Sequence, residues 1–148
     1  MAAPTLGELV APGRTALVLQ EIQNGIVGPT SGLRALADAA REVGAIANSG
    51  ALARAARAAG VPVVHATAES LPDRFGANRN ARLFHGARAQ GVGTAPGSES
   101  VAPVPEVYEP GDVVLPRYHG LSPITGTQLD SLLRNAGITN VVIVGVSL

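Results

Sequence analysis

Residues 15–24 have the sequence TALVLQEIQN, and the prediction of the fold starts from this stretch. Four consecutive apolar residues, 16–19, lie between Pro-Gly and Asn-Gly pairs that form turns, a pattern typical of a buried parallel strand. Glu21, Gln23 and Asn24 follow, at the end of the strand where open α/β sheets bind their ligands. Two interpretations stay open: these side chains belong to a site, or Glu21 is a solvated loop acid and the amides shape a turn.

The remaining pattern alternates helices with strands. The expected elements are a helix over 32–59 with a bend or break at 48–50, strands over 61–66, 113–115 (stopped by a proline) and 138–145, and a helix over 125–135. Parallel strands joined by helices imply right-handed crossovers. The chain is therefore predicted to be a Rossmann-like three-layer α/β/α domain with a parallel sheet.

Residues 67–112 show the least regular pattern, and a loop of that length in a compact domain is usually functional or mobile. The pattern slightly favours a tolerated surface insertion. Its arginines either grip an anionic substrate or keep the loop in water; they are Arg74, Arg79, Arg82 and Arg88. Before this segment, His65 is expected to be a hydrogen-bonded core histidine. At its end, Gly111-Asp112 is expected to set a turn.

Composition excludes several classes of protein. The 148 residues suit one domain with one core. With 15% charged residues and a formal net charge of zero, we expect no nucleic-acid partner and no membrane surface. Residues 1–13 lack the pattern of a signal peptide, and no run is long enough to span a membrane, so a cytoplasmic protein is expected.

Two absences from the chain limit its chemistry. There is no cysteine, and all 11 basic residues are arginines. Within these residues, disulfides, thiolate metal sites, a cysteine nucleophile and a Schiff-base lysine are therefore excluded.

The apolar run at 141–144 predicts a central strand covered on both faces. No predicted helix follows it. We therefore expect residues 1–148 to be a single domain that lacks its C-terminal helices and strands.

Three segments together resemble the isochorismatase-like (cysteine) hydrolase family. They are ALVLQEIQN, LARAARAAGVPVVHA and SPITGTQLDSLLRNAGITNVVIVGVSL. The first is similar to a family strand that ends in Asp followed by Met-Gln-Asn, and the last to a Ser-Ala-Phe-x-Gly-Thr-x-Leu segment with its helix and strand. The resemblance implies the isochorismatase-like fold, hydrolysis of a small amide, ester or vinyl ether, no cofactor and a homo-oligomer.

The family uses an Asp, a Lys and a Cys. By resemblance, the Asp position is Glu21, and the Lys position falls on Tyr118, or on Arg117 with a shift of one residue. The Cys position lies a few residues beyond Leu148. Substrate-binding roles are expected for Gln23, Asn24 and His119. Some relatives bind a metal through an Asp and His pair near the second strand, but residues 65–69 lack that pattern, so no metal is expected.

Three functions remain as hypotheses. The first is a family hydrolase with an altered triad, in which Glu21 is the base and Arg117 or Tyr118 its partner. The second is a catalytically inactive relative that binds a small ligand or serves as an oligomeric scaffold, because the chain has no lysine and carries Glu21 at the Asp position. The third, a nucleotide-binding Rossmann domain, is disfavoured because no G-x-G-x-x-G follows the first strand.

Overall fold

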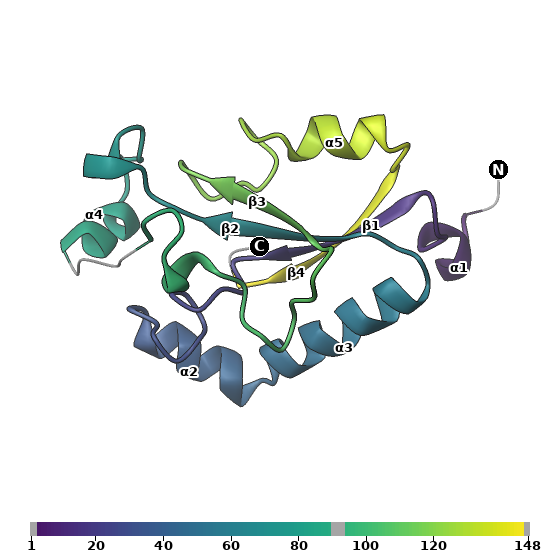
Figure 1. The fold of residues 1–148 in the computed structure, drawn as a ribbon, viewed down its shortest axis with the longest axis horizontal. Coiled ribbons are helices and arrows are strands. Elements are labelled where there is room, and N and C mark those ends of the chain that lie inside the picture. The colour runs from purple at the N-terminus through teal and green to yellow at the C-terminus, as the bar shows by residue number, and fades with distance from the viewer. Residues whose placement is uncertain (1–2, 90–93, 147–148) are drawn as a thin grey trace.

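The computed structural model describes residues 3–89 and 94–146. Its centre is a parallel sheet with the strand order β3-β2-β1-β4 (Figure 1). The strands are β1 (Thr15–Gln20), β2 (Val63–Ala68), β3 (Val113–Arg117) and β4 (Asn140–Gly145). The sheet confirms the predicted Rossmann-like parallel architecture.

Helices cover both faces of the sheet. They are α1 (Leu6–Leu9), α2 (Arg34–Glu42), α3 (Ala45–Ala58), α4 (Arg82–Ala89) and α5 (Leu129–Asn135), with short 3-10 turns η1 (Pro72–Arg74) and η2 (Glu99–Val101). Figure 1 shows α2 and α3 on one face and α5 on the other. No helix in the described part of the chain is both long and apolar enough to cross a membrane.

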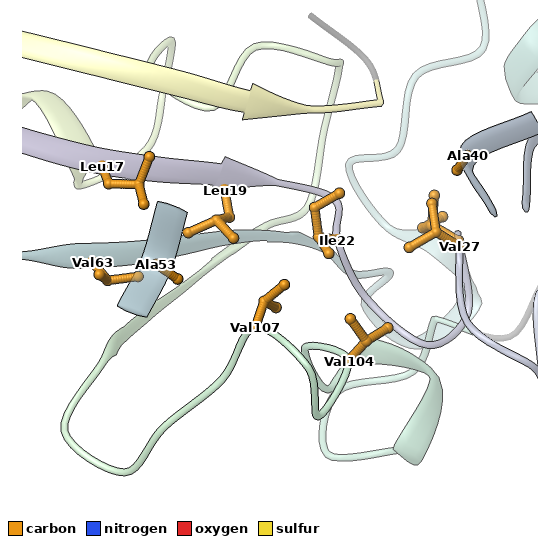
Figure 2. Close-up of a cluster of buried hydrophobic side chains, with 10 residues drawn as sticks. Leu17, Leu19, Ile22, Val27, Ala40, Ala53, Val63, Val104 and Val107 are labelled. Atoms are coloured by element: carbon orange, nitrogen blue, oxygen red, sulfur yellow. The ribbon is translucent and has the colours of Figure 1, made fainter. Parts of the chain in front are cut away.

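Alternating residues of β1 and β2 build the two halves of the core. Leu17, Leu19 and Val63 pack toward α3, where Ala53 joins them (Figure 2). Val18 and Val64 point to the opposite face and pack with Leu129 of α5. Because both faces are covered, every residue of β1 is buried.

The expectation of a surface insertion over residues 67–112 is wrong for its second half. Val101, Val104 and Val107 are all buried. Figure 2 shows Val104 and Val107 beside Leu19 and Ile22, beneath the sheet. Small apolar residues spaced at three along a Pro-rich segment gave no helical or strand periodicity, so the sequence did not reveal this packing.

Two helices occupy residues 34–58, as the break in the pattern predicted, but the break lies elsewhere. It falls at Gly44, whose φ of 67° is left-handed and separates α2 from α3. Gly50 lies inside α3, where a Cβ would come 2.5 Å from the carbonyl oxygen of Glu106. Gly50 therefore serves close packing against the 104–107 segment and does not end a helix.

The strand over 113–115 extends further than predicted. Pro116 does not stop it, and β3 continues to Arg117. Among the described strands β3 lies at an edge of the sheet, where a residue without an N–H is tolerated. The two extra residues carry Arg117 to the carboxyl edge of the sheet.

The other outer strand in the described part is β4. Val142 and Val144 pack against the core, whereas Val141 and Ile143 are 38% and 40% exposed. The expectation that further elements cover this strand stays a prediction.

Candidate active site

Glu21 follows β1 directly and has an unusual backbone. Its φ is 57°, in the left-handed region that residues other than glycine seldom adopt. Its N–H donates to the carbonyl of Ala66 at 3.0 Å, so the turn is fixed to β2. Such a conformation costs on the order of 1 kcal/mol or more and is concentrated at functional sites.

The Glu21 side chain forms a buried ion pair with Arg117. The Arg117 Nη2 atom donates to Glu21 Oε1, and the two side chains are only 6% and 4% exposed. Arg117 Nη1 also donates to the carbonyl of Leu121 at 2.9 Å, while Nε is buried with no hydrogen-bond partner among the described residues. Of the two predicted partners, Arg117 is therefore the one that contacts Glu21, and Tyr118 is its neighbour.

The pair lies at the wall of a cavity of about 230 Å³. The carboxyl ends of β1, β2 and β3 contribute Glu21, Glu69 and Arg117. Leu33 and Phe84 belong to the apolar lining. A cavity of this size, lined by both polar and apolar side chains, suits a small organic molecule.

The 67–89 part of the predicted insertion forms much of this cavity. Arg74 and Arg79 line it, together with His85 of α4. Arg82 is exposed and is not among the lining residues. The side chain of Arg88 lies outside the described residues. This part of the segment therefore contributes to the candidate site. The sequence pattern had slightly favoured the other interpretation, a tolerated surface insertion.

Known proteins of similar sequence identify the family of the chain. A model of the isochorismatase domain matches residues 15–148. The chain belongs to the isochorismatase family. It is 34% identical to the ureidoacrylate amidohydrolase RutB of Rhizobium rhizogenes over 92% of this chain and 60% of that protein. The corresponding protein of Methylobacterium radiotolerans is 32% identical, over 92% of this chain and 57% of that protein.

Solved structures agree with this assignment. An isochorismatase family protein from Burkholderia thailandensis has a TM-score of 0.64 and 29% identity, over 98% of this chain and 68% of that chain. The family resemblance seen in the sequence is confirmed. The chain spans about 60% of the length of the curated relatives that it matches.

Gln23 and Asn24 of this isochorismatase-family chain have structural partners. Gln23 bonds both backbone groups of Ala68, since its Oε1 accepts from the N–H of Ala68 at 2.6 Å and its Nε2 donates to the Ala68 carbonyl at 3.0 Å. Asn24 Nδ2 donates to the carbonyl of Glu99 at 3.2 Å. Neither is among the residues that line the cavity. A substrate-binding role for either stays a prediction.

Tyr118 and His119 both line the cavity. The Nε2 atom of His119 lies 3.3 Å from the carbonyl oxygen of Gly126, which orients the ring. Their catalytic and substrate-binding roles stay predictions. Among the described residues no group of three or more His, Asp or Glu side chains could hold a metal ion.

Sequence reasoning missed Glu69 as a site residue. It follows β2 directly and lines the cavity, and its N–H donates to the carbonyl of Arg117 at 2.9 Å. Burial raises the pKa of its carboxyl group. Its position at the carboxyl edge of the sheet, as the acid that follows the second strand, was the signal that could have found it.

A second buried charge cluster lies away from the cavity. His65 Nε2 donates to Asp112 Oδ2 at 2.8 Å, and Arg57 Nη2 donates to the same oxygen at 2.6 Å. Burial alone would raise the pKa of the Asp112 carboxyl group. Hydrogen bonds from Arg57, His65 and the Glu109 N–H outweigh the effect of burial and lower the pKa to about 2. His65 is thus a hydrogen-bonded core histidine, as predicted. Asp112 accepts a hydrogen bond from the Glu109 N–H within its turn. It also links β2 to α3 through His65 and Arg57, and the sequence did not predict this role.

Proposed function

We propose that this isochorismatase-family chain carries the carboxylate and cation of a hydrolase site that cleaves a small acid amide or ureido acid. The observation that carries the proposal is the buried Glu21–Arg117 pair at the wall of a cavity of about 230 Å³. The names of the ureidoacrylate amidohydrolase relatives support a carbon–nitrogen bond as the one that is cleaved. They also support a substrate with a ureido group and a carboxylate.

Glu21 is the base in this proposal. It takes the proton of the nucleophile as the nucleophile adds to the carbonyl carbon of the substrate. Arg117 stays protonated throughout, because guanidinium has a pKa above about 12. It holds the Glu21 carboxylate in position and stabilises negative charge that develops on the carbonyl oxygen.

The nucleophile completes the proposal. The 148 residues contain no cysteine. The expectation from the resemblance, a nucleophile at a position beyond Leu148, is kept as part of the proposal. Glu21 would act in the same way on a water molecule, so its variants test the site under either route.

Arg79 supports an acidic substrate. Its side chain is exposed at the cavity lining, and no hydrogen bond or ion pair joins it to another described residue. A guanidinium that is free to pair matches the planar geometry of a carboxylate. The apolar wall at Leu33 and Phe84 would accept the carbon chain of the same small molecule.

Product release tests the function. The protein is offered N-carbamoyl amino acids and small primary amides, with ammonia as the readout, and p-nitrophenyl esters, with p-nitrophenolate as the readout. We expect turnover of at least one ureido acid or amide, and a loss of about 100-fold in Glu21→Gln, because general base catalysis is typically worth that much or more. Glu42→Gln, the same change on the exposed end of α2, serves as the control. No turnover of any compound, or an unaffected Glu21→Gln, would contradict the proposal.

The second candidate is ligand binding without catalysis. The Glu21 carboxylate is already paired with a guanidinium that cannot give up a proton, and this observation favours it. It predicts heat of binding for ureido acids in calorimetry and no release of ammonia. The homo-oligomer and the cytoplasmic location stay predictions.

A further inference from the structure

Glu69 gives the cavity a second carboxyl group, on the strand next to that of Glu21. Both residues follow their strands directly, β1 and β2, which are paired in parallel. The Glu69 N–H donates to the Arg117 carbonyl at 2.9 Å, so its backbone is fixed to the residue that pairs with Glu21. The three residues form one cluster at the carboxyl edge of the sheet.

The two carboxyl groups have different surroundings. Glu21 is paired with Arg117, whereas Glu69 has no ion pair with any described residue. Its side chain accepts a long hydrogen bond at Oε1 from Thr67 Oγ1, at 3.4 Å. Burial raises the pKa of the Glu69 carboxyl group, which favours its protonated form relative to a solvated glutamate. Two carboxyl groups whose environments differ in this way are suited to opposite roles in acid–base chemistry.

Cleavage of an amide needs an acid, because an amine anion is too basic to leave unprotonated. Arg117 cannot supply that proton. The other titratable groups of the cavity are the two histidines, of which His119 contacts the Gly126 carbonyl and His85 lies on α4, and the phenol of Tyr118. Arg74 and Arg79 complete its charged groups. Glu21 already has the role of the base, and Glu69 is the other carboxyl group among the described lining residues, fixed by its own backbone to Arg117.

We infer that Glu69 is the proton donor to the leaving nitrogen, an inference that rests on the hydrolase function proposed above. The nucleophile forms its bond to the carbonyl carbon and loses its proton to Glu21. The carbon–nitrogen bond then breaks, its electron pair stays on nitrogen, and nitrogen takes the proton of Glu69 and departs as a neutral amine or ammonia. Where the nucleophile belongs to the protein, a water molecule then adds to the acyl carbon and gives its proton to Glu69. The nucleophile departs with the proton held by Glu21, so the acid product leaves and both carboxyl groups return to their starting states. Where the nucleophile is water, solvent reprotonates Glu69 and takes the proton from Glu21.

The leaving group separates this role from a structural one. A p-nitrophenolate departs without a proton, whereas the nitrogen of an amide does not. We therefore compare turnover of an amide with turnover of the p-nitrophenyl ester of the same acyl group, in the wild type, Glu69→Gln, Glu69→Asp and the Glu42→Gln control. We expect Glu69→Gln to lose about 100-fold on the amide and less than about 5-fold on the ester. We expect Glu69→Asp to recover part of the amide activity.

The possible results separate a failure of the Glu69 inference from a failure of the proposed function. If Glu69→Gln loses both activities equally, or neither, Glu69 is not the proton donor while the hydrolase function stands. If the wild type cleaves only the ester, no acid is required and the inference is overturned. If the wild type cleaves neither compound and no other member of the substrate panel, the proposed function and this inference fail together.

Discussion

Arg117 reaches across β2 to pair with Glu21, although β1 and β3 are not neighbours in the sheet. Both side chains are almost fully buried, at 4% and 6% exposure. Removing one member of a buried pair leaves an uncompensated charge, which costs much more than removing both members. The pair is therefore a unit in stability as well as in the proposed chemistry.

Arg117→Met should lower the free energy of unfolding by about 3 kcal/mol or more, because it removes the cation that balances the buried Glu21 carboxylate. The double variant Glu21→Gln/Arg117→Met should be less destabilised than Arg117→Met alone. Urea denaturation of the two variants and of Glu21→Gln measures this coupling. Additive losses would show that the two residues act independently.

The His65–Asp112 contact predicts how stability depends on pH. Burial lowers the pKa of His65 below its ordinary value of 6.5, despite the hydrogen bond to Asp112. The unfolded chain then binds more protons than the folded one as pH falls below about 6.5, so stability falls with pH in that range. In His65→Gln the loss between pH 7 and pH 5 should be smaller. Thermal denaturation at a series of pH values measures it, and an unchanged slope would contradict the prediction.

Asp112 affects the stability of the fold at lower pH than His65 does. Its pKa of about 2 lies below the ordinary 3.8, so its contribution to stability is present above about pH 4 and is lost as pH falls toward 2. Asp112→Asn should be less stable at pH 7 and should show a shallower loss between pH 4 and pH 2. Urea midpoints at these pH values provide the measurement. A variant with the same acid slope as the wild type would remove Asp112 as the cause.

Gly50 provides a test of the close packing beneath α3. Alanine usually stabilises a helix by about 1 kcal/mol relative to glycine. At Gly50 the added Cβ would come 2.5 Å from the Glu106 carbonyl oxygen, so Gly50→Ala should instead destabilise by about 1–3 kcal/mol. Gly86→Ala is the matched control, because its Cβ would meet nothing within 4 Å in α4. Equal effects of the two variants on the thermal midpoint would show that the contact is not tight.

The sheet could be predicted from the sequence because each strand is an apolar, β-branched run of its own. The same local signal placed Glu21 at the carboxyl edge. The local signal could not decide whether Arg117 or Tyr118 is the partner of Glu21, because counting back from Gly126 depends on the length of the loop before it. Only the extension of β3 through Pro116 sets Arg117 against Glu21.

The features that sequence reasoning missed depend on contacts between distant segments. Val104 and Val107 are isolated apolar residues in a Pro-rich stretch, and they are buried only because that stretch folds beneath β1. Gly50 looked like a helix break because its neighbour, Glu106, is more than fifty residues away in the chain. Asp112 looked like a turn residue, and its bonds to Arg57 and His65 likewise join segments far apart.

The role of Glu21 as the base of a hydrolase site can be measured by kcat/KM for a ureido acid or amide in Glu21→Gln and Glu21→Asp. Glutamine keeps the size and the hydrogen-bonding oxygen but cannot take a proton, whereas aspartate, the residue usual in the family, keeps the carboxylate. We expect a loss of about 100-fold or more in Glu21→Gln and of less than about 10-fold in Glu21→Asp. Equal values for the two variants, or full activity in Glu21→Gln, would contradict it.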